Sequence, residues 1–72
     1  MIRIIYNNKH ITIKGEYNTK LVQIMKLFQA RYHNRTWSLP KYKVDDLIEE
    51  FINQGFDYVE VNKPLYKVIK GQ

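Results

Sequence analysis

The chain has 72 residues, of which 44% are hydrophobic and 14% aromatic, and it carries 12 Lys and Arg against 7 Asp and Glu. This length allows one domain with a small core and excludes a two-lobed enzyme, a barrel or a dinucleotide-binding fold. The apolar content excludes a disordered segment.

The formal net charge of +5 is unevenly distributed along the chain. Residues 1–44 carry nine basic and one acidic side chain, whereas residues 45–72 carry three basic and six acidic ones. A negatively charged polymer is therefore the first partner to consider. The alternative is that the positive charge only keeps a small domain soluble.

The sequence contains no cysteine, which excludes a disulfide framework and a thiolate metal site. Because such a chain is compatible with a reducing compartment, we expect an intracellular protein, in the cytoplasm of a bacterial host or in the nucleus of a eukaryotic or virus-infected cell. No apolar run approaches the roughly 18–20 residues that a membrane span needs, so no membrane partner is expected.

The first two predicted strands form a β-hairpin. Residues 2–6 are rich in β-branched and aromatic side chains, which are typical of strands. Residues 10–14 alternate strictly, with two isoleucines on one side and three polar residues on the other. Asn7 and Asn8 can adopt the left-handed backbone of a tight turn between the strands.

A helix and a second hairpin are expected next. Apolar residues at helical spacing predict a helix over about residues 19–29, with Asn18 as its N-cap. Residues 30–32 and 36–39 should then pair as strands around a turn at residues 33–35.

The last third of the chain predicts a second helix and a final strand. Apolar residues recur at i, i+3, i+4, i+7 and i+8, the pattern of an amphipathic helix. They are Val44, Leu47, Ile48, Phe51 and Ile52. Asp45 and Asp46 would lie in the first turn, where the helix dipole favours anions, and Gly55 suits the position that ends the helix. Residues 58–61 form the last strand.

The order β-β-α-β-β-α-β predicts a small α+β domain, a mostly antiparallel sheet with two helices on one face. The helices must cover the face that bears Ile11, Ile13, Leu39 and Trp37. The opposite, open face carries His10, Thr12, Lys14, Thr36 and Ser38 by alternation. Arg3 and Ile5 share one side of the first strand, and the pattern does not decide whether that side faces the helices or the solvent. A face with basic and hydroxyl side chains and no acidic residue suits a phosphate backbone, but it also fits an ordinary solvated surface.

One block of the sequence combines a helix, a Tyr, a short polar turn, a basic residue, a Trp, an apolar–Pro pair and a second helix with an apolar pair. Its residues are Tyr32, Arg35, Trp37, Leu39, Pro40, Leu47 and Ile48. The block is similar to the HARP domain, which accompanies Swi/Snf-type annealing helicases that rewind single-stranded DNA and remodel forks. The resemblance covers about residues 11–61. The family usually has a longer turn between its Tyr and Trp than the four residues found here, so the hairpin tip is shortened.

The resemblance implies a non-enzymatic DNA-binding accessory domain over residues 1–62, with a role in DNA repair or recombination. Residues 63–72 would be a tail or the start of a linker, because residues 63–67 resemble the approach to a helicase core. The parent protein would be a helicase, such as a viral or phage one, and its core would be a second partner besides DNA.

The candidate binding residues are basic side chains around the second hairpin turn, joined by two from the first hairpin. They are Lys9, Lys14, Arg31, Arg35, Lys41 and Lys43. Single-stranded or junction DNA would bind through its phosphates, and six such contacts to a single strand predict a slope of about −4 in log K against log salt. The alternative for each lysine is an ordinary surface residue. These residue types do not distinguish DNA from RNA.

Trp37 has two interpretations. An exposed Trp37 would stack on an unpaired base, whereas its alternation with Leu39 places it in the core, and the small size of the domain favours burial. Tyr32 would then pair with it across the hairpin. Tyr6 and Tyr17, where exposed, would be better stacking candidates.

The sequence offers no catalytic or cofactor site. Its three glycines lie far apart, and none precedes the Lys-Ser or Lys-Thr of a Walker loop. The two histidines lack the spacing of a zinc site, so no metal is expected. Four acidic residues at i, i+1, i+4 and i+5 could imitate a magnesium cluster, but they are more simply the solvated side of the second helix.

A protein-interaction adaptor is the alternative function. The acidic side of the second helix and an edge strand at residues 58–61 would dock a partner protein. The acidic residues concerned are Asp45, Asp46, Glu49 and Glu50. Reversing their charge should then harm function, while changes at Arg31 and Arg35 should be tolerated.

Overall fold

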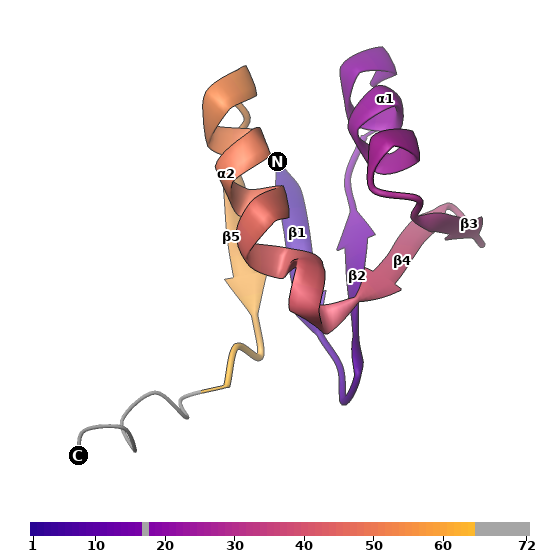
Figure 1. Ribbon diagram of the computed structural model, residues 1–72, viewed down its shortest axis with the longest axis vertical. Helices are drawn as coiled ribbons and strands as arrows, with labels where there is room; N and C mark the ends of the chain where they lie inside the picture. The colour runs from indigo at the N-terminus through magenta and orange to yellow at the C-terminus, as the bar shows by residue number, and fades with distance from the viewer. Residues whose placement is uncertain (17, 65–72) are drawn as a thin grey trace.

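The computed structural model describes residues 1–16 and 18–64. The elements are β1 (Ile2–Tyr6), β2 (His10–Lys14), α1 (Thr19–Leu27), β3 (Arg31–His33), β4 (Thr36–Pro40), a single 3-10 turn η1 (Lys41–Lys43), α2 (Val44–Gln54) and β5 (Tyr58–Val61). Figure 1 shows this order along the chain. The predicted succession of strands and helices is confirmed.

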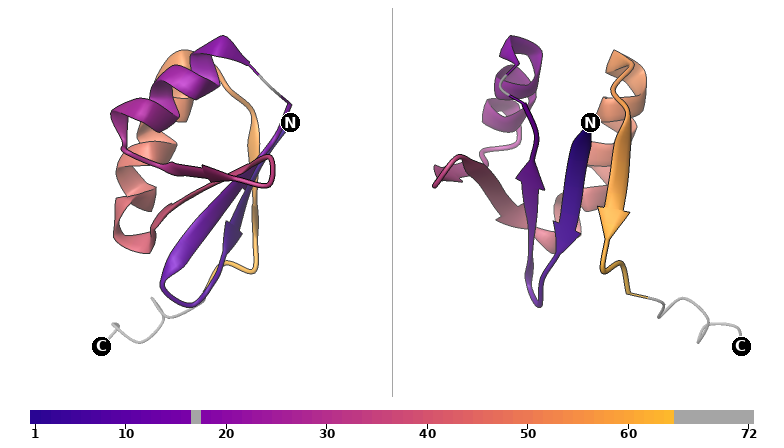
Figure 2. Two further views of the ribbon diagram at one scale, coloured as in Figure 1. Left: turned by 90° about the vertical axis from the view of Figure 1, so that its right-hand side faces the viewer. Right: turned by 180° about the vertical axis from the view of Figure 1, so that it is seen from behind.

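The five strands form one sheet in the order β3-β4-β2-β1-β5. All neighbouring strands are antiparallel except β1 and β5, which run parallel. Both helices lie on the same side of this sheet (Figure 2). The structure thus confirms the predicted α+β class, and it leaves β3 and β5 as the two sheet edges.

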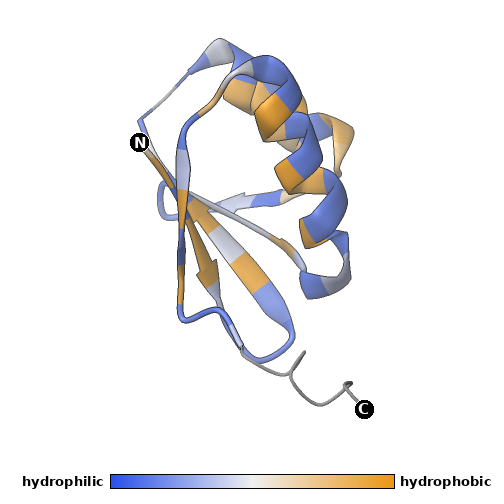
Figure 3. Cartoon of the chain, turned by 90° about the vertical axis from the view of Figure 1, so that its left-hand side faces the viewer, coloured by the Kyte–Doolittle hydropathy of each residue, from blue (hydrophilic) through white to orange (hydrophobic). Residues whose placement is uncertain are grey.

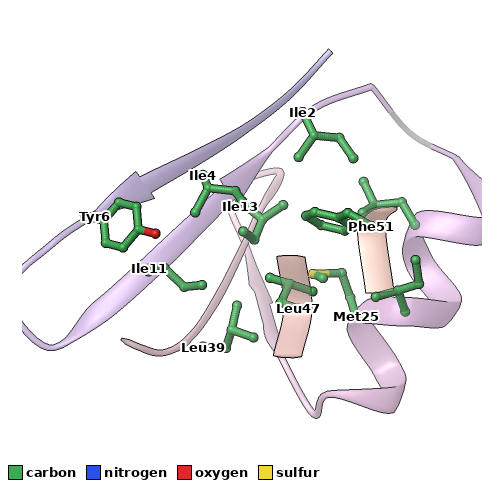
Figure 4. Packing of buried hydrophobic residues seen from close by; sticks show 11 residues of the cluster. Ile2, Ile4, Tyr6, Ile11, Ile13, Met25, Leu39, Leu47 and Phe51 are labelled. Carbon is green, nitrogen blue, oxygen red and sulfur yellow. The ribbon is translucent and has the colours of Figure 1, made fainter. Parts of the chain in front are cut away.

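The core lies between the sheet and the two helices. Its buried side chains are Ile2, Ile4, Tyr6, Ile11, Ile13, Leu21, Ile24, Met25, Leu39, Leu47 and Phe51. Figure 4 shows how the strand side chains meet those of the helices. Apolar and polar residues alternate around the helices (Figure 3), so each helix turns one apolar face to the sheet. Burial of these apolar side chains is the main stabilising term of the fold.

The start of α1 and the ends of both helices follow from local chemistry. The Asn18 side-chain oxygen accepts hydrogen bonds from the backbone N–H groups of Lys20 and Leu21, at 2.8 and 3.2 Å, which confirms the predicted N-cap. Helix α1 ends at Leu27, two residues earlier than predicted, because the chain turns left-handed at Gln29 (φ 60°). Helix α2 ends at Gly55, whose φ of 79° is accessible to glycine without strain.

The turn between β3 and β4 is a two-residue hairpin loop. Asn34 and Arg35 both have positive φ, 50° and 64°, which is the backbone of the turns that match the twist of paired strands. The Thr36 hydroxyl donates to the carbonyl of His33 at 2.8 Å and braces the turn. The predicted turn is therefore confirmed, and the backbone sets the direction in which Arg35 leaves the hairpin tip.

Candidate nucleic-acid interface

The sheet face opposite the helices is open, and alternation along β1 decides what it presents. Ile2, Ile4 and Tyr6 are buried on the helix side, so Arg3 and Ile5 lie on the open face. The ambiguity that the sequence leaves for β1 is thereby resolved.

Strand register arranges the open face in rows. One row runs from Val59 through Arg3 to Lys14, since Arg3 is the partner of both residues on the neighbouring strands. A second row runs across all five strands, through Val61, Ile5, Thr12, Ser38 and Arg31. Basic residues thus lie on β1, β2 and β3, spread over about 14 Å at the usual strand spacing.

No carboxylate shares this face among the described strands. The acidic strand residue is Glu60, which pairs with buried Ile4 and therefore points to the helix side. There it accepts a hydrogen bond from the Tyr6 hydroxyl at 2.6 Å and forms an ion pair with Lys63 at 3.5 Å. That ion pair is the one found in the described part of the chain, so the cations of the open face are not neutralised within it.

Arg3 and Lys14 are direct cross-strand partners, and both are exposed. Like charges at opposing positions of an antiparallel pair destabilise the sheet. An anion lying between the two side chains would convert this repulsion into two favourable charge-assisted contacts. Phosphate is an anion of this kind, and Arg binds it with a planar fork of donors.

The structure does not gather the six predicted basic residues into one patch. Lys14 and Arg31 lie on the open face. Arg35 lies at the tip of the β3–β4 hairpin. Lys9 and Lys41 meet at the opposite end of the sheet, where the backbone N–H of Lys41 donates to the carbonyl of Lys9 at 3.0 Å.

Lys43 is used by the fold itself. Its ammonium group donates to the carbonyl of Phe28 at 2.9 Å, in a partly buried contact. Phe28 caps the C-terminus of α1, where a cation is favoured by the helix dipole. We therefore remove Lys43 from the candidate interface and add Arg3, which the ambiguous pattern of β1 concealed.

Trp37 lies on the helix side of β4, half-buried against the core, so its predicted burial is partial. Tyr32 pairs with it across the hairpin as predicted, with ring centroids 4.7 Å apart, and is itself 58% exposed. Tyr6, which the sequence left unassigned, does not meet the condition of exposure for a stacking candidate, because its side chain is only 8% exposed and belongs to the core. Tyr17 lies outside the described residues.

The acidic side of α2 is separated from the open face. Asp45, Asp46 and Glu49 are exposed, and Glu50 accepts a hydrogen bond from the Gln54 side chain at 3.0 Å. Among the described residues, no group of three or more His, Cys, Asp or Glu side chains could hold a metal ion. Within the same residues, no helix has the length and apolar character needed to cross a membrane.

The fold and site thus define a small α+β domain whose open sheet face carries cations that have no ion-pair partner in the described part of the chain. Family models, curated proteins and solved structures were each compared with the chain, and none of them matches it. The resemblance to the HARP domain therefore stays a prediction, as do residues 1–62 as a HARP-like unit and residues 63–72 as a tail. Of that tail, residues 65–72 lie outside the described part.

Proposed function

We propose that the domain is a non-enzymatic module that binds single-stranded DNA through its phosphate backbone, on the open face of the sheet. The observation that carries this proposal is the cross-strand pair of Arg3 and Lys14 on a face where the described strands place no carboxylate. Arg31 extends the cationic track toward the β3 edge. The hydroxyl groups of Thr12 and Ser38 lie between these cations and supply neutral donors for phosphate oxygens.

This arrangement suits backbone binding rather than base readout. The open face of the described strands bears no Phe, Tyr or Trp, and its only ring side chains for stacking are the imidazoles of His10 and His33. Three phosphate contacts on a single strand give a slope of about −2 in log K against log salt. The six contacts expected from the sequence would give about −4. The measured slope therefore distinguishes binding by the three cations of the open face from binding by all six predicted residues.

The test is a titration of a labelled single strand at several salt concentrations, with charge-neutral variants. Lys14→Gln and Arg31→Gln should each weaken binding and make the slope shallower by about 0.7, because each removes one phosphate contact. Lys20→Gln is the matched control, since it removes the same charge from an exposed position on α1. Equal effects of all three variants would mean that only net charge matters, and absence of binding at low salt would end the proposal.

The role of an accessory module for a helicase extends this proposal. A helicase partner moves along or rewinds strands of any sequence, and binding through phosphates carries no sequence preference. Comparing a single strand, a duplex and a fork of equal length would show which form the face prefers. A stronger affinity for the duplex would contradict the single-strand assignment.

Docking of a partner protein is the second candidate function. The observation that favours it is the position of β5 at a sheet edge, where a further strand could add by backbone hydrogen bonds. The exposed acidic side of α2 would then select a basic partner segment. Neutralising Asp45 and Asp46 together should abolish capture of such a partner and leave DNA affinity unchanged or slightly higher.

A further inference from the structure

A hollow of about 270 Å³ lies between the tip of the β3–β4 hairpin and the start of α1. Its lining combines apolar side chains, aromatic rings and one residue of each charge. The residues are Gly15, Glu16, Asn18, Leu21, Val22, Tyr32, Arg35 and Trp37. The hollow is on the helix side of the hairpin, so it is distinct from the open face described above.

The aromatic side of this hollow is supported by the hydrophobic core. Trp37 is half-buried and packs against the core, and the ring of Tyr32 lies 4.7 Å from it, tilted by 54°. Tyr32 is 58% exposed, because β3 is a sheet edge of only three residues. The pair therefore offers a partly exposed aromatic surface that is supported by the core.

Charged groups stand at the rim of the hollow. Arg35 reaches it from the left-handed turn at the hairpin tip, and Glu16 reaches it from the segment that joins β2 to α1. The guanidinium group suits a phosphate. When ionised, the Glu16 carboxylate can only accept hydrogen bonds, and the N–H groups on the edges of nucleobases are suitable donors for it.

Only the edge strand β3 separates the hollow from the open face. Arg31 and His33 pair with Ser38 and Thr36 on that face, while Tyr32 between them points to the helix side. A strand bound across the open face reaches β3 at its outer edge. The next nucleotide of that strand would have to pass only the edge strand β3 to reach Tyr32.

We propose that this hollow receives one unpaired base of the bound strand, which stacks on Tyr32 with its phosphate beside Arg35. This inference rests on the proposed function, since the strand must first lie on the open face. Stacking on an aromatic side chain is tolerant of sequence, because every base has a π-face. The module would then bind the phosphates on one face and hold one base on the other side of the edge strand.

The test compares an oligothymidine with an abasic strand of the same length, about 12 nucleotides. Both strands offer the same phosphates, but only the first has bases. The wild-type domain should bind the oligothymidine about 5- to 150-fold more tightly than the abasic strand. Tyr32→Ala should lose this preference and bind both strands alike, whereas Tyr32→Phe should keep it.

Tyr42→Ala is the matched control, because Tyr42 is 80% exposed but does not line the hollow. It should behave as the wild type on both strands. Trp37 is the one tryptophan of the chain, so its fluorescence provides a second readout. It should change when the oligothymidine binds and stay constant with the abasic strand.

The outcomes separate the two proposals. If the wild type binds the two strands equally, or if Tyr32→Ala retains the preference for bases, the base site is refuted while the phosphate-binding face stands. If neither strand binds at low salt, both proposals fall. Thermal unfolding of Tyr32→Ala by circular dichroism must match that of Tyr32→Phe within a few degrees. If Tyr32→Ala loses the fold, Tyr32→Leu is the deciding variant, because it keeps an apolar side chain without an aromatic ring and should lose the preference for the oligothymidine.

Discussion

Replacing Lys43 by methionine tests whether this cation serves the fold or a binding surface. Methionine keeps an unbranched stem but removes the charge and the three donors. The ammonium group donates to the Phe28 carbonyl at 2.9 Å, at the C-terminal end of α1. A hydrogen bond from a charged donor contributes about 1.5–3 kcal/mol. Because the contact is only partly buried and water can replace some of it, we expect the free energy of unfolding to fall by about 1–2 kcal/mol.

Urea denaturation measures this loss. With a slope near 1 kcal/mol per molar, typical of small domains, the midpoint should move down by about 1–2 M. Lys41→Met is the matched control, because it removes the same group from the same turn and no side-chain bond of Lys41 is found among the described residues. It should leave the midpoint unchanged. Equal midpoints for the two variants, or a loss of DNA affinity specific to Lys43→Met, would return Lys43 to the candidate interface.

Three further changes test the core, a helix end and the open face. Phe51→Ala removes a fully buried ring, 5.8 Å from a neighbouring aromatic ring, and should cost about 3–5 kcal/mol, enough to leave the domain largely unfolded in a thermal melt. Gly55→Ala should lower stability by about 1 kcal/mol, because residue 55 has a positive φ that alanine adopts only with strain. Gly15→Ala is its control and should be nearly neutral, because the added Cβ meets Ile2 at an ordinary 3.4 Å. Arg3→Glu should raise the melting temperature by a few degrees and weaken DNA binding, and unchanged stability would contradict the repulsion assigned to the open face.

Local patterns in the sequence were sufficient to predict most of the fold. The strict alternation of residues 10–14 placed Ile11 and Ile13 in the core, and both are fully buried. Asn18 and Gly55 carry the chemistry of a helix start and a helix end, and each lies where that chemistry is used. These predictions succeed because the interactions concerned span only a few residues.

The site was less predictable because it depends on contacts between distant segments. Ile2, Ile4 and Ile5 are apolar on both sides of β1, so periodicity alone did not assign Arg3 to a face. The parallel pairing of β1 with β5 and the antiparallel pairing with β2 decide that assignment. Lys43 follows the hairpin closely in sequence, yet its partner Phe28 is 15 residues away, at the C-terminal end of α1.

The six basic residues illustrate the same limit. Nearness in sequence suggested one patch around the central turn, but β4 carries the chain from one end of the sheet to the other between Arg35 and Lys41. Strand direction therefore separates residues that are only six positions apart. A basic cluster in a β-rich sequence is a single surface only where register, rather than sequence distance, brings its members together.

The cross-strand pair of Arg3 and Lys14 links stability to the proposed function. In the free domain the two cations repel each other and weaken the β1–β2 pairing by a few tenths to about 1 kcal/mol. A bound phosphate removes that repulsion, so binding should stabilise the domain beyond the contacts made at other positions. The gain from a single strand should therefore be smaller in Arg3→Glu, because the pair there is already attractive. A domain optimised for stability alone would carry opposite charges at these two positions, whereas like charges are what the proposed phosphate-binding face requires.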